Sequence, residues 1–112
     1  MKLPSLDKAV IEREKIVEYL LNPAHPDNGG KSAFFKSLGF SRDSWHMLAT
    51  ALRQLAEATD IAKSMESTHG VKYIIDGYIK SPNGKKAMVR MVWIVDREQD
   101  APRLVTVYPH KE

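Results

Sequence analysis

The C-terminal segment 71–109 constrains the fold of this chain more than any other stretch. It contains three runs rich in Val, Ile, Tyr and Trp, and the dipeptide Asn83-Gly84 separates the first two runs. Asn and Gly both tolerate the positive φ angles of a type I′ turn, so this dipeptide is a strong β-hairpin signal. The charged stretch 96–103 predicts a longer loop before the third run. The segment therefore predicts an antiparallel sheet built from consecutive strands.

The middle run, residues 87–95, is apolar at every position except Arg90. Side chains of a strand alternate between the two faces of a sheet, so a run that is apolar on both faces is typical of a central strand. Arg90 is then a charged residue in a largely buried row, which indicates a functional site. The alternative is an Arg whose stem follows the sheet and whose guanidinium reaches water at an edge.

A tight turn at Asn83-Gly84 also predicts the register of the hairpin. The predicted pairs are Pro82 with Lys85, Gly77 with Arg90, and Asp76 with Met91. Gly within a strand is unfavourable unless something needs the space, so this register predicts a gap beside Arg90. Asp76 is then a lone strand carboxylate, and no carboxylate pair for acid–base catalysis is expected.

The third run alternates two valines, Val105 and Val107, with Thr106 and Tyr108. With both valines on the core face, the two hydroxyl side chains lie on the opposite face, next to Arg90. We therefore expect one sheet face to carry Arg90, Thr106 and Tyr108 around a gap at Gly77.

The composition is that of a globular protein of one domain: 112 residues, of which 43% are hydrophobic and 28% are charged. No apolar run approaches the roughly 20 residues of a membrane span, and the N-terminus lacks the apolar region of a signal peptide. The absence of Cys excludes disulfides, thiolate zinc sites and a thiol nucleophile, and it favours the cytoplasm. A net charge of +3 permits an anionic partner without requiring one.

Helical patterns occupy residues 8–58. Residues 12–21 place apolar side chains at helical spacing and end at Asn22-Pro23, because the residue before a proline disfavours the α conformation. A short helix that carries Phe34 and Phe35 ends at Gly39. Ser41 then predicts the N-cap of a longer helix, whose apolar stripe is Trp45, Leu48, Leu52 and Leu55.

Helices followed by strands predict an α+β fold. We expect one domain over 1–112, with the helices of residues 8–58 packed on one face of an antiparallel sheet of three to four strands in 71–109. Residues 59–70 are expected to be a polar connection, and residues 9–11 either a short strand or the lead-in to the first helix. The second face of the sheet is left for a site.

The loop 23–32 carries the second candidate feature. Its GGKS sequence is not a P-loop, because His25 occupies the position of the first glycine and no strand precedes it. A glycine-flanked turn that opens a helix near Lys31 can still present backbone N–H groups and an ammonium group to one anion. His25 can titrate near neutral pH in the same loop. The alternative is that both residues are ordinary exposed loop residues.

No metal site is expected, because the four histidines lack HxxH or HExxH spacing and no carboxylate cluster accompanies them. No GxSxG motif is present, and His69 is a weaker candidate base than His25. The remaining candidate residues are His25, Lys31, Arg90, Thr106 and Tyr108, without a cofactor. They fit metal-independent RNA cleavage, in which one group takes the 2′-OH proton, another protonates the leaving 5′-oxygen, and cations stabilise the phosphorane. They fit equally a site that only binds phosphate.

Several motifs resemble a family of short bacterial proteins known as a domain of unknown function. They are K-I-V-E-Y-L-L-N-P-x-H-P, G-x-K-S-A-F-F, V-R-x-V-W-x-V and P-R-L-V-T-x-Y-P, and the resemblance spans Leu3 to Pro109. In its layout and its closing L-V-T-x-Y strand, the chain is similar at a greater distance to the superfamily that includes barnase, EndoU, colicin D and RelE. This resemblance implies a ribonuclease toxin paired with an antidote protein, with His25 and Lys31 near the helices and Arg90, Thr106 and Tyr108 on the sheet.

The leading hypothesis is a metal-independent endoribonuclease of bacterial toxin type, which binds RNA in the cytoplasm and is neutralised by an antitoxin or immunity protein. His25 would act as general base or acid, Lys31 and Arg90 would hold the phosphate, and Thr106 and Tyr108 would position it. The second hypothesis is a non-catalytic module that binds phosphate, nucleic acid or protein, including the silent member of a toxin–antitoxin pair. Such a module predicts salt-dependent binding without cleavage. No membrane partner is expected.

Overall fold

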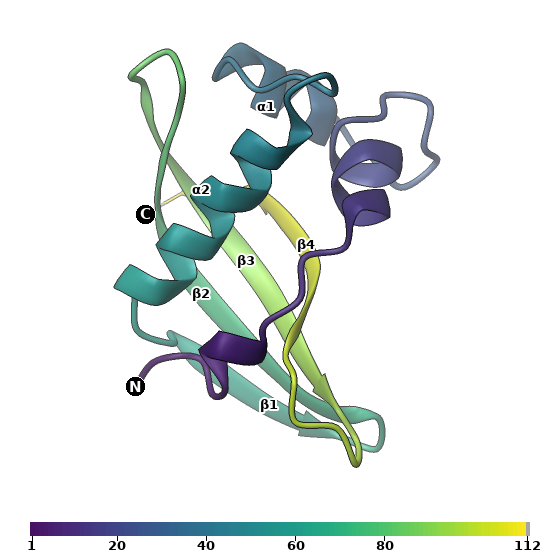
Figure 1. The fold of residues 1–112 in the computed structure, drawn as a ribbon, viewed down its shortest axis with the longest axis vertical. Helices are drawn as coiled ribbons and strands as arrows, with labels where there is room; N and C mark the ends of the chain where they lie inside the picture. Colours follow the sequence, from purple (N-terminus) through teal and green to yellow (C-terminus); the bar gives the residue numbers. More distant parts are fainter. Residues whose placement is uncertain (112) are drawn as a thin grey trace.

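The structure, a computed structural model, describes residues 1–111 and confirms the α+β class. Helices cover one face of a four-stranded antiparallel sheet whose strands follow chain order (Figure 1). The strands are β1 (Lys63–Ser67), β2 (Gly70–Lys80), β3 (Lys86–Asp96) and β4 (Arg103–Pro109). No helix within the described residues has the length and apolar character to cross a membrane.

The segment 59–70 is not the polar connection that the sequence predicts, because residues 63–67 form β1. This strand pairs with β2 in an antiparallel hairpin that closes at Ser67 and Gly70. All of its side chains are exposed, so backbone pairing holds it in place. Its sequence therefore lacks the alternation of apolar and polar residues by which a strand is predicted. Gly70 has a φ of +144°, and a Cβ there would overlap the carbonyl oxygen of Val95. The tight hairpin therefore requires glycine at this position.

The helical elements are η1 (Leu6–Lys8), the π-helical turn η2 (Lys15–Leu20), α1 (Lys31–Ser37) and α2 (Trp45–Ala58). Gly39 follows the end of α1 with a φ of +96°, as the sequence predicts. The helix α2 starts later than expected, since Ser41 does not cap it. The Ser41 hydroxyl instead accepts the backbone N–H of Ser44 at 3.3 Å and closes the preceding turn.

Residues 9–11 contribute a single bridge at the outer edge of β4. The backbone N–H of Val10 donates to the carbonyl of Pro102 at 2.8 Å, and the N–H of Leu104 donates to the carbonyl of Val10 at 3.1 Å. Of the two expectations for this segment, the short strand is the nearer to the structure.

The register of the β2–β3 hairpin differs by one residue from the predicted one. The loop comprises residues 81–85, and the ladder begins with Lys80 opposite Lys86. Asp76 therefore lies opposite Arg90, and Gly77 lies opposite Val89. A tertiary contact explains the wider loop: the Asn83 side chain donates to the Ser37 carbonyl at the end of α1, at 2.8 Å.

The one-residue difference moves Gly77 to the face that the helices cover. A Cβ at Gly77 would lie 2.8 Å from Cδ1 of Leu55, so this glycine lets α2 pack closely on β2. The prediction of a gap beside Arg90 is therefore wrong. The helix-covered face is filled by fully buried side chains, namely Ile75, Ile79, Val89, Met91, Trp93 and Val107.

The pairing of β3 with β4 contains a bulge. Trp93 lies opposite Leu104 and Val92 lies opposite Thr106, so Val105 is the extra residue. Leu104 and Val107 are buried, whereas Val105 is only half-buried. The prediction that Val105 lies on the core face together with Val107 is therefore wrong. Beyond the bulge, Thr106 and Tyr108 lie on the sheet face opposite the helices, which we call the open face.

Candidate active site on the open face of the sheet

Arg90 and Asp76 form the centre of the open face. The Arg90 Nε–H donates to Oδ1 of Asp76 at 2.7 Å, and Nη2 donates to Oδ2 at 2.9 Å. The hydrogen bond from Arg90 is the largest cause of a lowered pKa of Asp76, and the same bond raises the pKa of Arg90. This two-point contact fixes the plane of the guanidinium and turns its Nη1 edge away from Asp76. The predicted pairing of Asp76 with Met91 is wrong for the same register reason.

His110 joins this pair from the end of β4. Its backbone N–H donates to the Met88 carbonyl at 3.0 Å, which continues the strand pairing past Pro109. Its Nε2 lies 3.3 Å from Nη2 of Arg90 and 3.7 Å from Oδ2 of Asp76. A neutral imidazole can accept from Arg90 at this atom, and a protonated imidazole lies within ion-pair distance of Asp76. The arrangement suits a group that takes up and releases a proton.

Tyr108 and Thr106 complete the sheet part of the site. Tyr108 lies opposite Arg90, and its proximity is a further, smaller cause of the raised pKa of the guanidinium. Thr106 lies opposite Val92, and its Oγ1 is 2.8 Å from the hydroxyl of Tyr19. The structure thus brings together three of the five residues that the sequence indicates.

His25 is connected to Thr106 of β4 through Tyr19. Nδ1 of His25 accepts the backbone N–H of Asp27 at 3.0 Å, so the neutral ring carries its proton on Nε2. The imidazole packs edge-on against the Tyr19 ring, with 5.0 Å between the centroids. These two side chains and Thr106 line a hollow of about 580 Å³. Tyr19 therefore contacts both His25 and Thr106, and all three side chains line the same hollow.

Lys31 does not face an anion site. Its Nζ donates to the carbonyls of Asp27 and Asn28 at 3.3 and 3.2 Å, and it lies 5.5 Å from the centre of the Tyr19 ring. Asn28, only 3% exposed, also occupies the first N–H groups of α1: its carbonyl accepts from Lys31 and its Oδ1 accepts from Ser32, both at 3.0 Å. The expected anion site at this turn is therefore wrong, and Lys31 instead holds the loop that carries His25.

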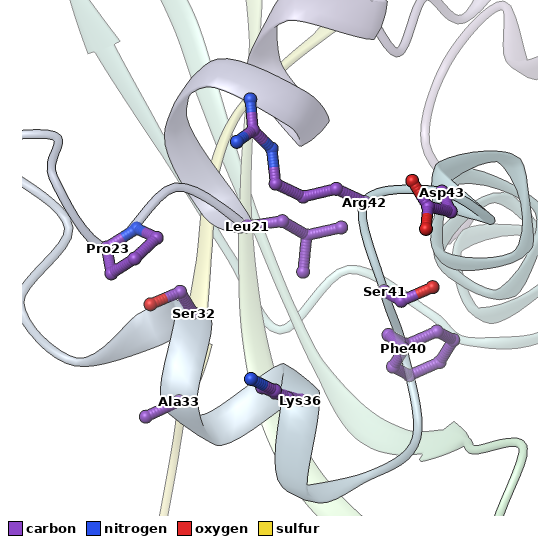
Figure 2. Close-up of a pocket in the computed structure, with 9 residues that line it drawn as sticks. All are labelled: Leu21, Pro23, Ser32, Ala33, Lys36, Phe40, Ser41, Arg42 and Asp43. Atoms are coloured by element: carbon purple, nitrogen blue, oxygen red, sulfur yellow. The ribbon is translucent and has the colours of Figure 1, made fainter.

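Another hollow, of about 550 Å³, lies among the helices (Figure 2). The buried side chains of Leu21 and Phe40 contribute apolar walls, and Lys36 and Arg42 are the cations on its lining. It has no histidine and only one carboxylate, that of Asp43. None of the residues that the sequence indicates lines this hollow, so the open face is the better candidate for chemistry.

Two residues of the open-face site, Asp76 and His110, were missed in the sequence. The signal for His110 is its spacing, since it follows Thr106 and Tyr108 at intervals of two along one strand face. Asp76 faces Arg90 only in the observed register, and the turn sequence alone does not predict that register. Within residues 1–111, no three His, Asp or Glu side chains are placed to hold a metal ion.

Comparisons with known proteins agree with this description of the fold. The family model of a domain of unknown function, DUF6883, matches residues 2–111. No curated protein matches the sequence significantly. Among solved structures, a chain of a contact-dependent growth inhibition toxin–immunity protein complex from Klebsiella pneumoniae 342 has a TM-score of 0.74. The two chains are 19% identical over 91% of this chain and 100% of that chain, a similarity that shows a shared fold.

Proposed function

We propose that this chain, which belongs to the DUF6883 family, is a toxin-type endoribonuclease that cleaves cytoplasmic RNA without a metal ion. The observation that carries the proposal is the placement of Arg90, Tyr108 and His110 side by side on the open face of the sheet. The fold shared with a chain of a toxin–immunity protein complex supports pairing with a neutralising protein partner.

Arg90 is the group that would hold the reacting phosphate. Negative charge builds on the non-bridging oxygens as the phosphorane forms, and a fixed cation stabilises that charge without having to reorganise. Asp76 supplies the fixation, because it binds the Nε and Nη2 edge and leaves the Nη1 edge to face a ligand. The hydroxyls of Tyr108 and Thr106 then orient the phosphate along β4.

Two histidines would carry the protons. His110 takes the 2′-OH proton at Nε2, and the imidazolium that forms is stabilised by Asp76, 3.7 Å away. The 2′-oxygen bonds to phosphorus as the bond from phosphorus to the 5′-oxygen breaks. For this step His25 acts as an imidazolium, which gives up the hydrogen bond that its Nδ1 accepts from Asp27. It passes its Nε2 proton to the 5′-oxygen and becomes neutral, while the Tyr19–Thr106 hydrogen bond spaces it from the phosphate. The products are a 2′,3′-cyclic phosphate and a 5′-hydroxyl.

The decisive experiment mixes purified protein with total RNA and tRNA in excess EDTA and tests the new ends for 2′,3′-cyclic phosphate. We expect cleavage by the wild type and a loss of about 10²–10⁴-fold in His110→Gln and in His25→Gln. His46→Gln is the matched control, since His46 is an exposed residue of α2, and it should cleave at the wild-type rate. Intact RNA in every lane, with folded protein, would refute the proposal.

A second candidate function rests on the charge around His25. The hollow beside it is lined by four carboxylates, those of Glu12, Glu14, Glu18 and Asp27. Such a rim repels phosphate and attracts a basic protein surface. On this basis the chain would be the non-catalytic member of a toxin–antitoxin pair.

Expression in bacteria separates the two candidates. A ribonuclease should stop growth when expressed alone, and Arg90→Ala should relieve the inhibition. A non-catalytic member should be harmless in both forms, and it should bind its partner with an affinity that falls when Glu14 and Glu18 are replaced by Gln.

A further inference from the structure

The open face carries a second hollow, of about 630 Å³, beside the candidate active site. Its lining includes Met65, His69, Lys72, Ile94, Arg103 and Val105. Val105, the extra residue of the β4 bulge, lines both this hollow and the one beside His25. The two hollows therefore adjoin at Val105, and Thr106 lies at their junction.

The second hollow combines an apolar floor with cations at its sides. Met65 is 39% exposed, so a flat apolar group can rest on it, and Ile94, only 6% exposed, forms the deeper part of the floor. Arg103 is held by Asp96 through hydrogen bonds of 2.7 and 3.1 Å, in the same two-point geometry as Arg90 with Asp76. Its Nη1 edge is likewise turned away from the carboxylate.

Lys72 supplies a second cation on the same face. It is exposed, and it forms no ion pair with any residue in the described part of the chain. An apolar surface for a base and cations for its phosphates are the two elements with which proteins bind single-stranded nucleic acid. A base can reach the floor only if it is unpaired, which favours single-stranded over duplex RNA.

The charges of the two hollows indicate towards which of them the RNA extends from Arg90. The hollow beside His25 is lined by four carboxylates and one cation, Lys15, whereas the second hollow has Lys72 and Arg103 against Asp96 and Glu66. A polyanion that passes Arg90 therefore meets an excess of negative charge on the first side and balanced charge on the second, so the second side is the more favourable path. Along β3, Arg90 and Ile94 are about 13 Å apart at about 3.3 Å per residue, a span that a strand of a few nucleotides covers.

We propose that the second hollow is a nucleotide subsite, which binds single-stranded RNA next to the cleaved phosphate with a base on Met65 and phosphate on Lys72 and Arg103. This inference rests on the proposed ribonuclease function. It adds that substrates extending into the hollow bind more tightly than substrates that end at Arg90.

The test measures binding separately from cleavage. A fluorescent single-stranded oligoribonucleotide with 2′-O-methyl groups cannot undergo 2′-OH attack, so its anisotropy reports binding alone. We expect Lys72→Glu to raise the Kd about tenfold and to reduce the salt slope by about 1. The control is Lys36→Glu, because Lys36 is also exposed but lines the hollow among the helices. It should change the Kd less than about twofold.

Cleavage kinetics complete the test. Lys72→Glu should raise KM for a long substrate, leave kcat unchanged, and leave cleavage of a dinucleotide unaffected. Equal effects of Lys72→Glu and Lys36→Glu on the Kd would overturn the subsite, whatever the cleavage result. Binding through Lys72 by a wild-type protein that cuts no RNA would overturn the ribonuclease function and retain the binding site. No binding and no cleavage would overturn both.

Discussion

Arg90 lies directly opposite Asp76 in the β2–β3 ladder, and hydrogen bonds of 2.7 and 2.9 Å join the two side chains. A hairpin with a two-residue turn would have placed Arg90 opposite Gly77, without a carboxylate partner. The observed pair fixes the orientation of a cation on an uncovered sheet face, and it provides the acceptor that His110 needs when it is protonated.

The pH dependence of stability should report the Arg90–Asp76 pair. The folded-state pKa of Asp76 is lowered, so its contribution is present above the unfolded-state value, near 4, and is lost as the pH falls through the folded pKa. We expect the difference in Tm between the wild type and Asp76→Asn to shrink as the pH falls below about 4. Thermal unfolding followed by circular dichroism measures it, with the exposed Asp43→Asn as control. A difference that stays the same or grows as the pH falls below about 4 would contradict the pair.

The close approach of α2 to β2 predicts a coupled pair of mutations. Gly77→Ala places a methyl group 2.8 Å from Leu55 Cδ1 and should destabilise the protein by about 1–3 kcal/mol through overpacking. Leu55→Ala, at a buried position, should by itself cost about 2–4 kcal/mol. In the double variant the new methyl group fills vacated space, so the two losses should not add. Urea unfolding of the four proteins measures the coupling, and strict additivity would show that the two residues do not touch.

Asn28 should be the most sensitive polar residue of the loop 23–32. Its side chain donates to the carbonyls of Tyr19 and Leu20 at 2.7 and 3.3 Å and accepts from the N–H of Ser32. Asn28→Ala should destabilise the protein by about 2–4 kcal/mol, because it leaves buried backbone groups without partners. Asn28→Asp keeps the acceptor but sets a buried carboxylate oxygen against the carbonyl oxygens of Tyr19 and Leu20, so it should cost at least as much as Asn28→Ala near neutral pH. If urea unfolding gave the opposite order of the two variants, the hydrogen bonds of the Asn28 side chain would not be the main contribution to the stability of the loop.

The hydrogen bond between Tyr19 and Thr106 links the His25 loop to the sheet. Tyr19→Phe and Thr106→Val should each cost about 0.5–1.5 kcal/mol, and the double variant should cost less than their sum. Tyr19→Phe retains the ring on which His25 packs. Its effect on RNA cleavage should therefore be smaller than that of His25→Gln. A Tyr19→Phe variant as inactive as His25→Gln would assign the chemistry to the Tyr19 hydroxyl instead.

The sequence by itself determined the class of the fold and the identity of its central strand. A run that is apolar at every position but one is typical of a central strand, and residues 87–95 lie within β3, between β2 and β4. Alternation within residues 106–108 then placed Thr106 and Tyr108 on the face of Arg90. These are local consequences of strand geometry, and they do not depend on the rest of the chain.

Only the tertiary structure decided the register and the composition of the site. The amide of Asn83 binds the end of α1 instead of closing a two-residue turn, and the resulting loop moves Asp76 to Arg90 and Gly77 to Leu55. Asn28 likewise closes the anion site that the glycine-rich turn suggests. The Asn83 amide finds its partner 46 residues away, and a hydrogen bond between distant segments leaves no periodic pattern in the sequence.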